Sequence, residues 1–186
     1  MKTLVVIDMQ NDFIYGSLGS PLTQSVVSAV AAKVEAAAKK SERIIFTRDT
    51  HFDDYLKTPE GVKLPVEHCI QNTFGWDIIP ELQEIVQNYP CIYVNKPIFG
   101  SVNLMDYFSD SEEQEIEFCG VCTDICVVSN ALMAKSYYPN AKISINPKLC
   151  AGTSINNHLS AIDVMRSCQI DIIEAEREIG ERELVR

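Results

Sequence analysis

The sequence lacks long apolar runs and any excess of positive charge, and both absences exclude classes of protein. No apolar segment approaches the about 18 residues that a membrane-spanning helix needs. Asp8 interrupts the apolar start of the chain too early for the core of a signal peptide. The formal net charge of −10 would repel nucleic acid and anionic membrane surfaces. We therefore expect a cytoplasmic protein that binds neither nucleic acid nor membranes.

Signs of disorder or of several domains are also scarce. Charged residues make up 23% of the sequence and hydrophobic residues 46%, which is ordinary for a folded globular protein. No internal repeat, low-complexity tract or linker is apparent. A chain of 186 residues can bury roughly 70% of its unfolded surface in one core. We expect a single domain over residues 1–186.

The seven cysteines form an odd set, and a reducing cytosol would leave them without structural disulfides. Four of them lie inside or at the end of apolar, strand-like segments, where a free cysteine behaves as a small hydrophobic residue. A cysteine with a chemical role must therefore be identified by its neighbours.

Short apolar segments rich in β-branched residues alternate with longer amphipathic segments. The strand-like segments are residues 4–7, 43–47, 91–94, 116–119, 143–145 and 170–173. The helix-length segments are residues 25–38, 77–86 and 158–168. Continuous apolar strands that alternate with helices are typical of a parallel sheet covered on both faces. The sequence predicts an α/β fold with a Rossmann-like, doubly wound sheet of six mainly parallel strands.

Ligands of such sheets bind beyond the carboxyl ends of the strands, where two charged residues stand. Asp8 ends the first strand, and partial desolvation there would raise the pKa of its carboxylate and suit it to accept a proton. Lys96 ends the third strand, where its charge could hold a thiolate or a developing oxyanion. Taken alone, Asp8 is equally an ordinary loop residue or helix cap, and Lys96 an exposed lysine without a role.

The segment after the fourth strand combines cysteines with a predicted helix start. Thr123 or Asp124 is a natural N-cap, which places Cys126 in the first helical turn. Free backbone amides and the positive end of the helix dipole lower the pKa of a thiol there and can hold an oxyanion. The position favours a thiolate nucleophile, with a buried structural cysteine as the alternative.

A long irregular stretch from residue 48 to residue 75 contains two of the three histidines. Loops of this length inside a compact domain are usually functional. Asp49 and His51, with His68 from a distant part of the stretch, supply a carboxylate and two imidazoles, a common ligand set for zinc or iron. The alternative is that these side chains only form hydrogen bonds.

Together these segments resemble the isochorismatase-like cysteine hydrolases, and within them the nicotinamidase and pyrazinamidase branch. The resemblance extends over nearly the full chain, and its motifs occur in the order of the family. They are Ile-Asp-Met-Gln-Asn-Asp-Phe at residues 7–13, Arg-Asp-Thr-His at 48–51, residues 65–73, Lys96, and Gly-Val-Cys-Thr-Asp-Ile-Cys-Val at 120–127.

The resemblance implies a catalytic triad of Asp8, Lys96 and Cys126. It also implies a cis peptide between Val121 and Cys122, with the backbone amides of Cys122 and Cys126 forming an oxyanion hole. Relatives usually carry alanine where this chain has Cys122, so the turn here must accommodate a bulkier side chain.

The resemblance further implies one divalent transition metal held by Asp49, His51 and His68. Zinc is the metal we expect, although the same ligands suit iron and manganese. Some relatives carry a further histidine shortly after the first metal histidine, where this chain has Asp-Asp-Tyr at residues 53–55. We therefore leave the remaining coordination positions to water and substrate.

By resemblance, the chain is a cysteine-dependent amidohydrolase. It would convert nicotinamide, or a similar small aromatic carboxamide, to the acid and ammonia through a thioester, with the metal binding the pyridine nitrogen. A flat substrate would pack against the aromatic residues nearest the motifs, which are Phe13, Trp76 and Phe99. Relatives often form dimers or tetramers, so we expect a homo-oligomer.

Other functions stay open at this point. Another hydrolase of the same family could act on an N-carbamoyl compound, a different amide or an isochorismate-like vinyl ether. The predicted metal ligands argue against isochorismate, because that branch does not carry this site. A thiol redox protein could use Cys119 and Cys122, which have the spacing of a redox pair, but Cys119 should lie in a buried strand.

Overall fold

A computed structural model describes residues 2–173, which contain one six-stranded sheet. The strands lie in the order β3-β2-β1-β4-β5-β6, and all neighbouring strands are parallel. Their bounds are β1 (Lys2–Ile7), β2 (Arg43–Asp49), β3 (Ile92–Lys96), β4 (Glu115–Val121), β5 (Lys142–Ala151) and β6 (Asp171–Ile172). The predicted fold class is confirmed. The prediction of one domain over residues 1–186 reaches beyond the described residues and stays a prediction.

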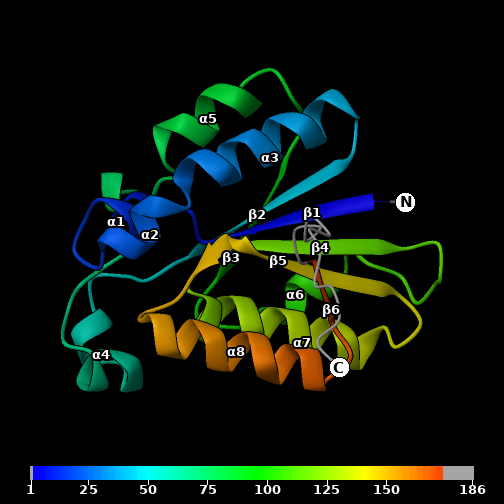
Figure 1. Ribbon diagram of the computed structural model, residues 1–186. Helices are drawn as coiled ribbons and strands as arrows, with labels where there is room; N and C mark the ends of the chain where they lie inside the picture. The colour runs from blue at the N-terminus through cyan, green and yellow to red at the C-terminus, as the bar shows by residue number, and fades with distance from the viewer. Residues whose placement is uncertain (1, 174–186) are drawn as a thin grey trace, which may run out of the picture.

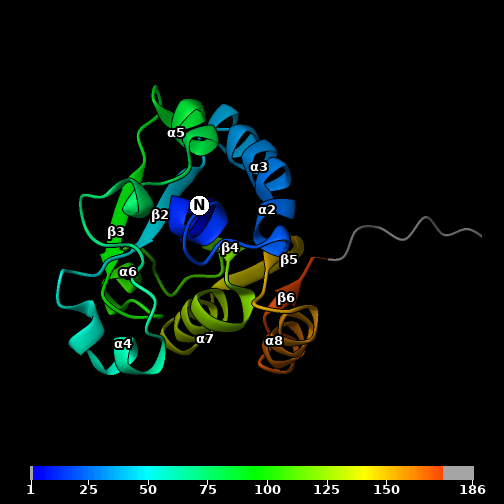
Figure 2. The same cartoon turned by 90° about the vertical axis from the view of Figure 1, so that its left-hand side faces the viewer.

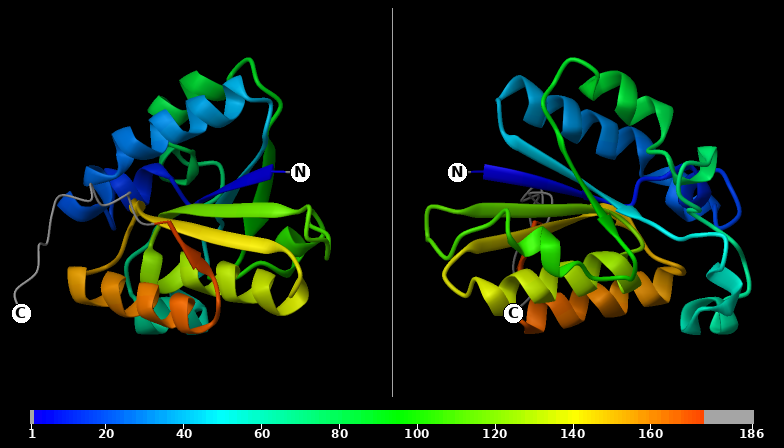
Figure 3. Two further views of the ribbon diagram at one scale, coloured as in Figure 1. Left: turned by 45° about the vertical axis from the view of Figure 1, so that its right-hand side comes forward. Right: turned by 180° about the vertical axis from the view of Figure 1, so that it is seen from behind.

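Helices cover both faces of this sheet (Figure 1). One layer contains α3 (Val27–Lys39) and α5 (Pro80–Val86), and the opposite layer contains α6 (Val102–Met105), α7 (Val128–Tyr137) and α8 (Ile155–Ser167), as Figure 3 also shows. Three short helices gather beyond the carboxyl ends of the strands, the end that faces the viewer in Figure 2: α1 (Asn11–Ile14), α2 (Pro21–Ser25) and α4 (Pro59–Lys63). Within residues 2–173, no helix has both the length and the apolar character of a membrane span.

Some element bounds differ from those predicted, for local reasons. The predicted helix over residues 25–38 corresponds to α3, which begins at Val27, because Ser20 and Pro21 start a separate short helix, α2, that ends at Ser25. The predicted helix over residues 77–86 begins at Pro80. Strand β5 continues to Ala151, well past the predicted end, through an irregularity in its pairing with β4.

Strands β1 and β4 lie at the centre of the sheet and approach each other closely at Gly120. This residue has φ +112° and pairs with Ile7. A Cβ atom at position 120 would lie 2.1 Å from the carbonyl oxygen of Ile7, so both the backbone conformation and the close approach require glycine. The strand order reverses between these two strands, and a ligand crevice is expected at their carboxyl ends.

Candidate active site

A cavity of about 330 Å³ opens at this crevice. Its lining combines two thiols, three side chains of metal-ligand type and a set of apolar side chains. The thiols are those of Cys122 and Cys126, the ligand-type residues are Asp49, Glu60 and His68, and the apolar residues are Phe13, Leu18, Leu64, Phe99 and Ile125. A mostly apolar cavity with a few convergent polar groups is the usual form of a small-molecule site.

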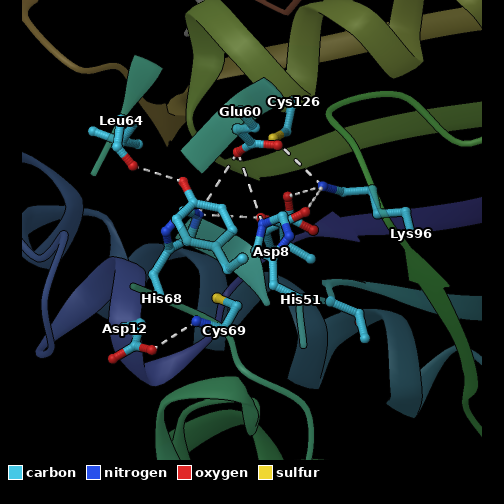
Figure 4. Close-up of polar contacts among 12 residues, drawn as sticks. Asp8, Asp12, His51, Glu60, Leu64, His68, Cys69, Lys96 and Cys126 are labelled. Atoms are coloured by element: carbon cyan, nitrogen blue, oxygen red, sulfur yellow. Dashed lines mark hydrogen bonds and ion pairs between the residues drawn. The ribbon is translucent and has the colours of Figure 1, made fainter. Parts of the chain in front are cut away.

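Lys96 connects the residues of the predicted triad (Figure 4). Its side chain is completely buried, and its Nζ lies 2.7 Å from Oδ2 of Asp8 and 3.5 Å from Sγ of Cys126. The same Nζ lies 3.2 Å from Oδ1 of Asp49, with which Lys96 is paired between β2 and β3. The structure therefore brings the three predicted residues together and adds Asp49 to the group.

Two neighbouring strands orient the carboxylate of Asp8. The residue follows β1 directly, has φ +48° and is completely buried. The hydroxyl of Thr47 in β2 donates a 2.6 Å hydrogen bond to Oδ1 and accepts one of 3.2 Å from the backbone N–H of Asp8. Burial raises the pKa of Asp8, although the ammonium of Lys96 opposes the rise. A buried carboxylate with a raised pKa is suited to carry a proton during a reaction.

The charges of Lys96 and Asp49 stabilise each other. Burial opposes the charge on Lys96, but the carboxylate of Asp8 and the neighbouring Cys126 and Asp49 raise its pKa well above the ordinary value. Burial likewise opposes ionisation of Asp49, but Lys96 and the hydrogen bonds with His51 and His68 hold the pKa of Asp49 far below its usual range. The strand ends therefore carry a buried ammonium beside an ionised carboxylate.

Cys126 lies in η3 (Thr123–Val127), a π-helical turn that connects β4 to α7. It is 5% exposed, and the peptide bond between Val121 and Cys122 is cis, as the family resemblance implied. Burial raises the pKa of the Cys126 thiol, and although Lys96 lowers it, the net value lies well above the ordinary one. The prediction of a thiol pKa lowered by the helix terminus is therefore wrong for the free protein. The nearby carboxylate of Asp8 also raises the pKa of the thiol, and Asp8 can accept the thiol proton.

The predicted N-cap of this helix is also wrong. Cys122 occupies the N-cap position and forms no side-chain cap hydrogen bond. The side chains of Thr123 and Asp124 instead bind His158 and Thr153, which lie on or just before α8. Tertiary contacts have thus replaced the local capping hydrogen bond that these residue types usually make.

Four residues present a second polar cluster beside the first. The possible ligand atoms of Asp49, His51, Glu60 and His68 all lie within 4.8 Å of one another. Nε2 of His51 is 3.0 Å and Nε2 of His68 is 3.5 Å from Oδ2 of Asp49, while Oε1 of Glu60 is 3.8 and 3.9 Å from the same two nitrogens. Nδ1 of His68 donates to the carbonyl of Val66, 2.8 Å away, which leaves Nε2 free to bind a metal. Two imidazoles and two carboxylates fit a divalent transition metal.

Glu60 is the site residue that the sequence prediction missed. It is the second residue of α4, which begins at Pro59 and is capped by the hydroxyl of Thr58 through a 3.0 Å hydrogen bond from the N–H of Gly61. The sequence Thr-Pro-Glu signals a helix start, so the helix was recognisable. The direction of the Glu60 side chain depends on how the helix packs, which the local sequence does not contain.

Aromatic and polar contacts also hold the segment that carries His51 and His68 in place. The completely buried ring of Tyr55 has its centroid 4.6 Å from that of His51 and 4.9 Å from that of His68, and its hydroxyl donates to the carbonyl of Leu64 at 3.0 Å. The N–H of Cys69, the residue after His68, donates to Oδ2 of Asp12 at 2.8 Å (Figure 4). These contacts fix the loop that carries the imidazoles.

Gln10 fixes the position of Asp49. Its Oε1 accepts a 2.7 Å hydrogen bond from the N–H of Asp49, and its Nε2 donates to the carbonyls of Asp49 and Trp76 at 2.9 and 2.8 Å. Gln10 is completely buried, so all of these hydrogen bonds are shielded from water.

The predicted pocket aromatics are only partly placed in the cavity. Phe13 and Phe99 line it, whereas Trp76 does not. The ring of Trp76 lies under the guanidinium of Arg48, 3.9 Å from its centroid, and its Nε1 donates to the hydroxyl of Thr50 at 2.8 Å. The prediction for Trp76 is corrected on this point, because proximity to a motif in sequence did not determine which way the ring faces.

The cysteines proposed for a redox pair lie in different environments. Cys119 is completely buried within β4 and does not line the cavity, whereas Cys122 is half-buried and does. Burial raises the pKa of both thiols, to about 12 for Cys122. Because Cys119 lies inside the buried strand and away from the cavity, the two thiols do not form a shared exposed redox site.

Comparison with known proteins identifies the family. The family model described as the isochorismatase domain matches residues 2–177. The chain is 26% identical over 176 residues to the nicotinamidase of Saccharomyces cerevisiae, covering 72% of this chain and 81% of that protein. The structure is similar to that of a pyrazinamidase/nicotinamidase from Streptococcus mutans UA159, with a TM-score of 0.80, 25% identity, and coverage of 93% of this chain and 100% of that one. It is also similar to the pyrazinamidase of Pyrococcus horikoshii in complex with zinc, with a TM-score of 0.79, 24% identity, and coverage of 94% and 99%. Because the family model covers nearly the whole sequence, the chain belongs to the isochorismatase domain family.

Proposed function

We propose that this chain hydrolyses nicotinamide, or a similar small aromatic carboxamide, to the acid and ammonia. The observation that carries the proposal is the convergence of Asp8, Lys96 and Cys126 on one apolar cavity, beside a cluster of metal-ligand type. The similarity to nicotinamidases and pyrazinamidases supports the substrate class.

The reaction begins at the thiol of Cys126. Asp8 accepts the thiol proton as the sulfur attacks the carboxamide carbon, and Lys96 stabilises the negative charge that develops on the sulfur. The tetrahedral oxyanion is held by the backbone amides of Cys122 and Cys126, and an oxyanion donor is typically worth about 3 to 4 kcal/mol. When the carbon–nitrogen bond breaks, Asp8 returns the proton and ammonia leaves.

The resulting thioester is hydrolysed in a second step. Asp8 removes a proton from an attacking water molecule, the water oxygen bonds to the acyl carbon, and the carbon–sulfur bond breaks. The acid is released and the sulfur regains its proton. Asp8 gives the proton taken from water to the departing sulfur, so it acts in turn as a base, an acid, a base and an acid, a cycle that its raised pKa suits.

The second cluster holds a divalent transition metal in this proposal. Asp49, His51, Glu60 and His68 would be its ligands, and the zinc complex of the Pyrococcus horikoshii pyrazinamidase supports zinc, with iron or manganese as alternatives. Bound there, the metal would supply a Lewis acid that binds the ring nitrogen of the substrate. Phe13 and Phe99 would pack against the flat ring.

The experiment is to incubate the purified protein with nicotinamide, pyrazinamide and a panel of N-carbamoyl compounds and to measure released ammonia. We expect release from the aromatic carboxamides by the parent protein and none by Cys126→Ala. Release of ammonia from the N-carbamoyl compounds alone would indicate that the chain is instead an N-carbamoyl hydrolase of the same family. The absence of release from every aromatic carboxamide would refute the proposal.

The substrate in this proposal is a small molecule, and the net charge of −10 disfavours a nucleic-acid partner. The cytoplasmic location and the homo-oligomeric state stay predictions. Light scattering on the purified protein would measure the number of subunits.

A further inference from the structure

Of the three histidines in the sequence, His158 lies outside the candidate metal site. It stands near the start of α8 and is half-buried. Its Nδ1 lies 2.8 Å from the hydroxyl oxygen of Thr123, a completely buried residue that begins η3. A helix that contributes no group to the cavity chemistry is therefore hydrogen-bonded to the turn that carries the nucleophile.

The residue after Thr123 is held by the same part of the chain. The carboxylate of Asp124 accepts hydrogen bonds from the N–H and the hydroxyl of Thr153, at 2.8 and 2.5 Å. The hydroxyl of Thr153 in turn accepts a 2.8 Å hydrogen bond from Asn157 in the first turn of α8. Two consecutive side chains at the start of η3 are thus bound, one to α8 itself and the other to the segment that leads into α8.

The connection is closely packed at Gly152. A Cβ atom at position 152 would lie 2.7 Å from Oδ1 of Asp124 and 2.9 Å from Cβ of His158. The segment before α8 therefore contacts both η3 and α8 with no space for a side chain between them. Gly152 and Thr153 also line the cavity, so the contact is continuous with the site wall.

We propose that His158 is a positioning residue for the Cys126 nucleophile and acts through the hydroxyl of Thr123. The inference rests on the proposed role of Cys126. Within η3, the carbonyl of Cys122 accepts hydrogen bonds from two N–H groups of the turn, those of Ile125 and Val127, each at 3.1 Å. These bonds shape the turn, but they do not fix its orientation against the neighbouring helix.

The orientation matters because of the distance between Cys126 and Lys96. Sγ lies 3.5 Å from Nζ of Lys96, within hydrogen-bond distance for sulfur, and a rotation of η3 that lengthens this distance would weaken the interaction. Displacements of about 1 Å at a reacting group can lower rates substantially. The Thr123–His158 hydrogen bond opposes such a rotation from the side of η3 that faces α8.

The chemistry of His158 suits a fixed, uncharged contact. Burial lowers the pKa of its imidazole, with Asp124 opposing the decrease, so the ring is neutral near pH 7. A neutral ring with its proton on Nε2 accepts the Thr123 hydroxyl at Nδ1. Asparagine can place a polar atom near the same position, whereas leucine fills the space without one.

The test uses the variants His158→Leu, His158→Asn, Thr123→Val and Thr123→Ser and the double variant Thr123→Val/His158→Leu. Asn156→Ala, at an exposed position on the first turn of α8, is the matched control. For each protein, kcat and KM are measured on nicotinamide, and the rate of iodoacetamide alkylation at Cys126 is followed by fragment-ion mass spectrometry. Alkylation reports the thiol without requiring any substrate.

We expect His158→Leu and Thr123→Val each to lower kcat and the alkylation rate by about fivefold, the rate equivalent of one hydrogen bond. KM should change little, and His158→Asn and Thr123→Ser should recover most of the loss. The double variant should be no slower than either single variant, because both remove the same interaction.

The proposal is overturned if His158→Leu matches Asn156→Ala in kcat and alkylation rate. A lower melting temperature of His158→Leu without a change in these two rates would also overturn it, because His158 would then have only a structural role. It is also overturned if His158→Asn is as slow as His158→Leu. Failure of the proposed function gives a different result: the parent protein releases no ammonia, while the alkylation series still reports whether His158 positions Cys126.

Discussion

The two polar clusters of the cavity are held in different ways. Asp8 follows the buried central strand β1 and Lys96 ends the edge strand β3, so the hydrogen bonds of the sheet determine where they lie. His51, Glu60 and His68 stand on the segment between β2 and β3, which is held by its own short helices and by side-chain contacts. The difference indicates that the sheet fixes Asp8 and Lys96, whereas the segment after β2 supplies three of the four possible metal ligands.

Among the hydrogen bonds and ion pairs of residues 2–173, those of Asp49 join the two clusters. Its Oδ1 lies 3.2 Å from Nζ of Lys96, and its Oδ2 lies 3.0 Å from Nε2 of His51. If the two clusters are independent units joined at one carboxylate, substitutions on either side should have separable effects. Three substitutions test this, in order of decreasing expected effect.

The largest effect is expected for Cys126→Ala. Loss of the nucleophile should lower kcat/KM on nicotinamide by at least about 10⁴-fold, as loss of a covalent nucleophile does in other hydrolases. Metal content, measured by elemental analysis, should stay at the parent level, because Cys126 contacts Lys96 and is not a member of the ligand cluster. Loss of metal in this variant would show that the two clusters are not independent units.

Cys119→Ala is the matched cysteine control. Its side chain is buried in β4 away from the cavity, so the variant should keep most of the activity even where stability falls. A loss of activity as large as that of Cys126→Ala would favour the redox alternative.

The next largest effect is expected for Lys96→Met. This change leaves the carboxylates of Asp8 and Asp49 buried without their common cation, and breaking such a buried pair typically costs about 3 to 5 kcal/mol. The free energy of unfolding, measured in urea, should fall by about this amount, and activity should be lost.

Lys39→Met provides the control for removing a lysine charge. Lys39 is exposed on α3, and its ion pair with Glu35 should contribute little to stability. If Lys96→Met and this control had equal free energies of unfolding, the ion pairs of Lys96 with Asp8 and Asp49 would not contribute to the stability of the fold.

A smaller and more local effect is expected for Glu60→Gln. If Glu60 is a ligand, zinc affinity should fall by more than the about 10- to 100-fold that is typical for a group that only supports a ligand. The free energy of unfolding of the metal-free protein should change little, because Glu60 is partly exposed. Competition with a chromophoric chelator measures the affinity.

Glu67→Gln is the control for this prediction, because Glu67 is an exposed carboxylate in the same segment and is not in the ligand cluster. Equal zinc affinity of the two variants would remove Glu60 from the ligand set.

The difference between the two clusters also explains what the sequence could predict. Asp8 and Lys96 were found because each follows or ends a short β-branched segment, and the carboxyl ends of parallel strands meet at one edge of the sheet. Glu60 was missed because its direction depends on the packing of α4, and Trp76 was misplaced because its ring binds Arg48 and Thr50 rather than the cavity.

The segment around Cys126 shows the limit most clearly. Its place after β4 follows from the order of strands, but Thr123 and Asp124 were expected to cap the helix locally. Their partners, Thr153 and His158, are about 30 residues away in sequence, and no local pattern identifies such a pairing. Local residue preferences predicted that a helix starts near Thr123, but contacts with distant residues determine the hydrogen bonds that Thr123 and Asp124 form.

Gly120 has a consequence for any attempt to redirect this protein to another amide. The cavity wall formed by α2, α4 and the segment before α8 offers many side chains that could be exchanged. Position 120 offers none, because even one methyl group there would press on the carbonyl of Ile7, the residue before Asp8. The absence of a side chain at position 120 thus allows the close approach of β1 and β4 directly before Asp8, and a library that varies the wall should leave this glycine untouched.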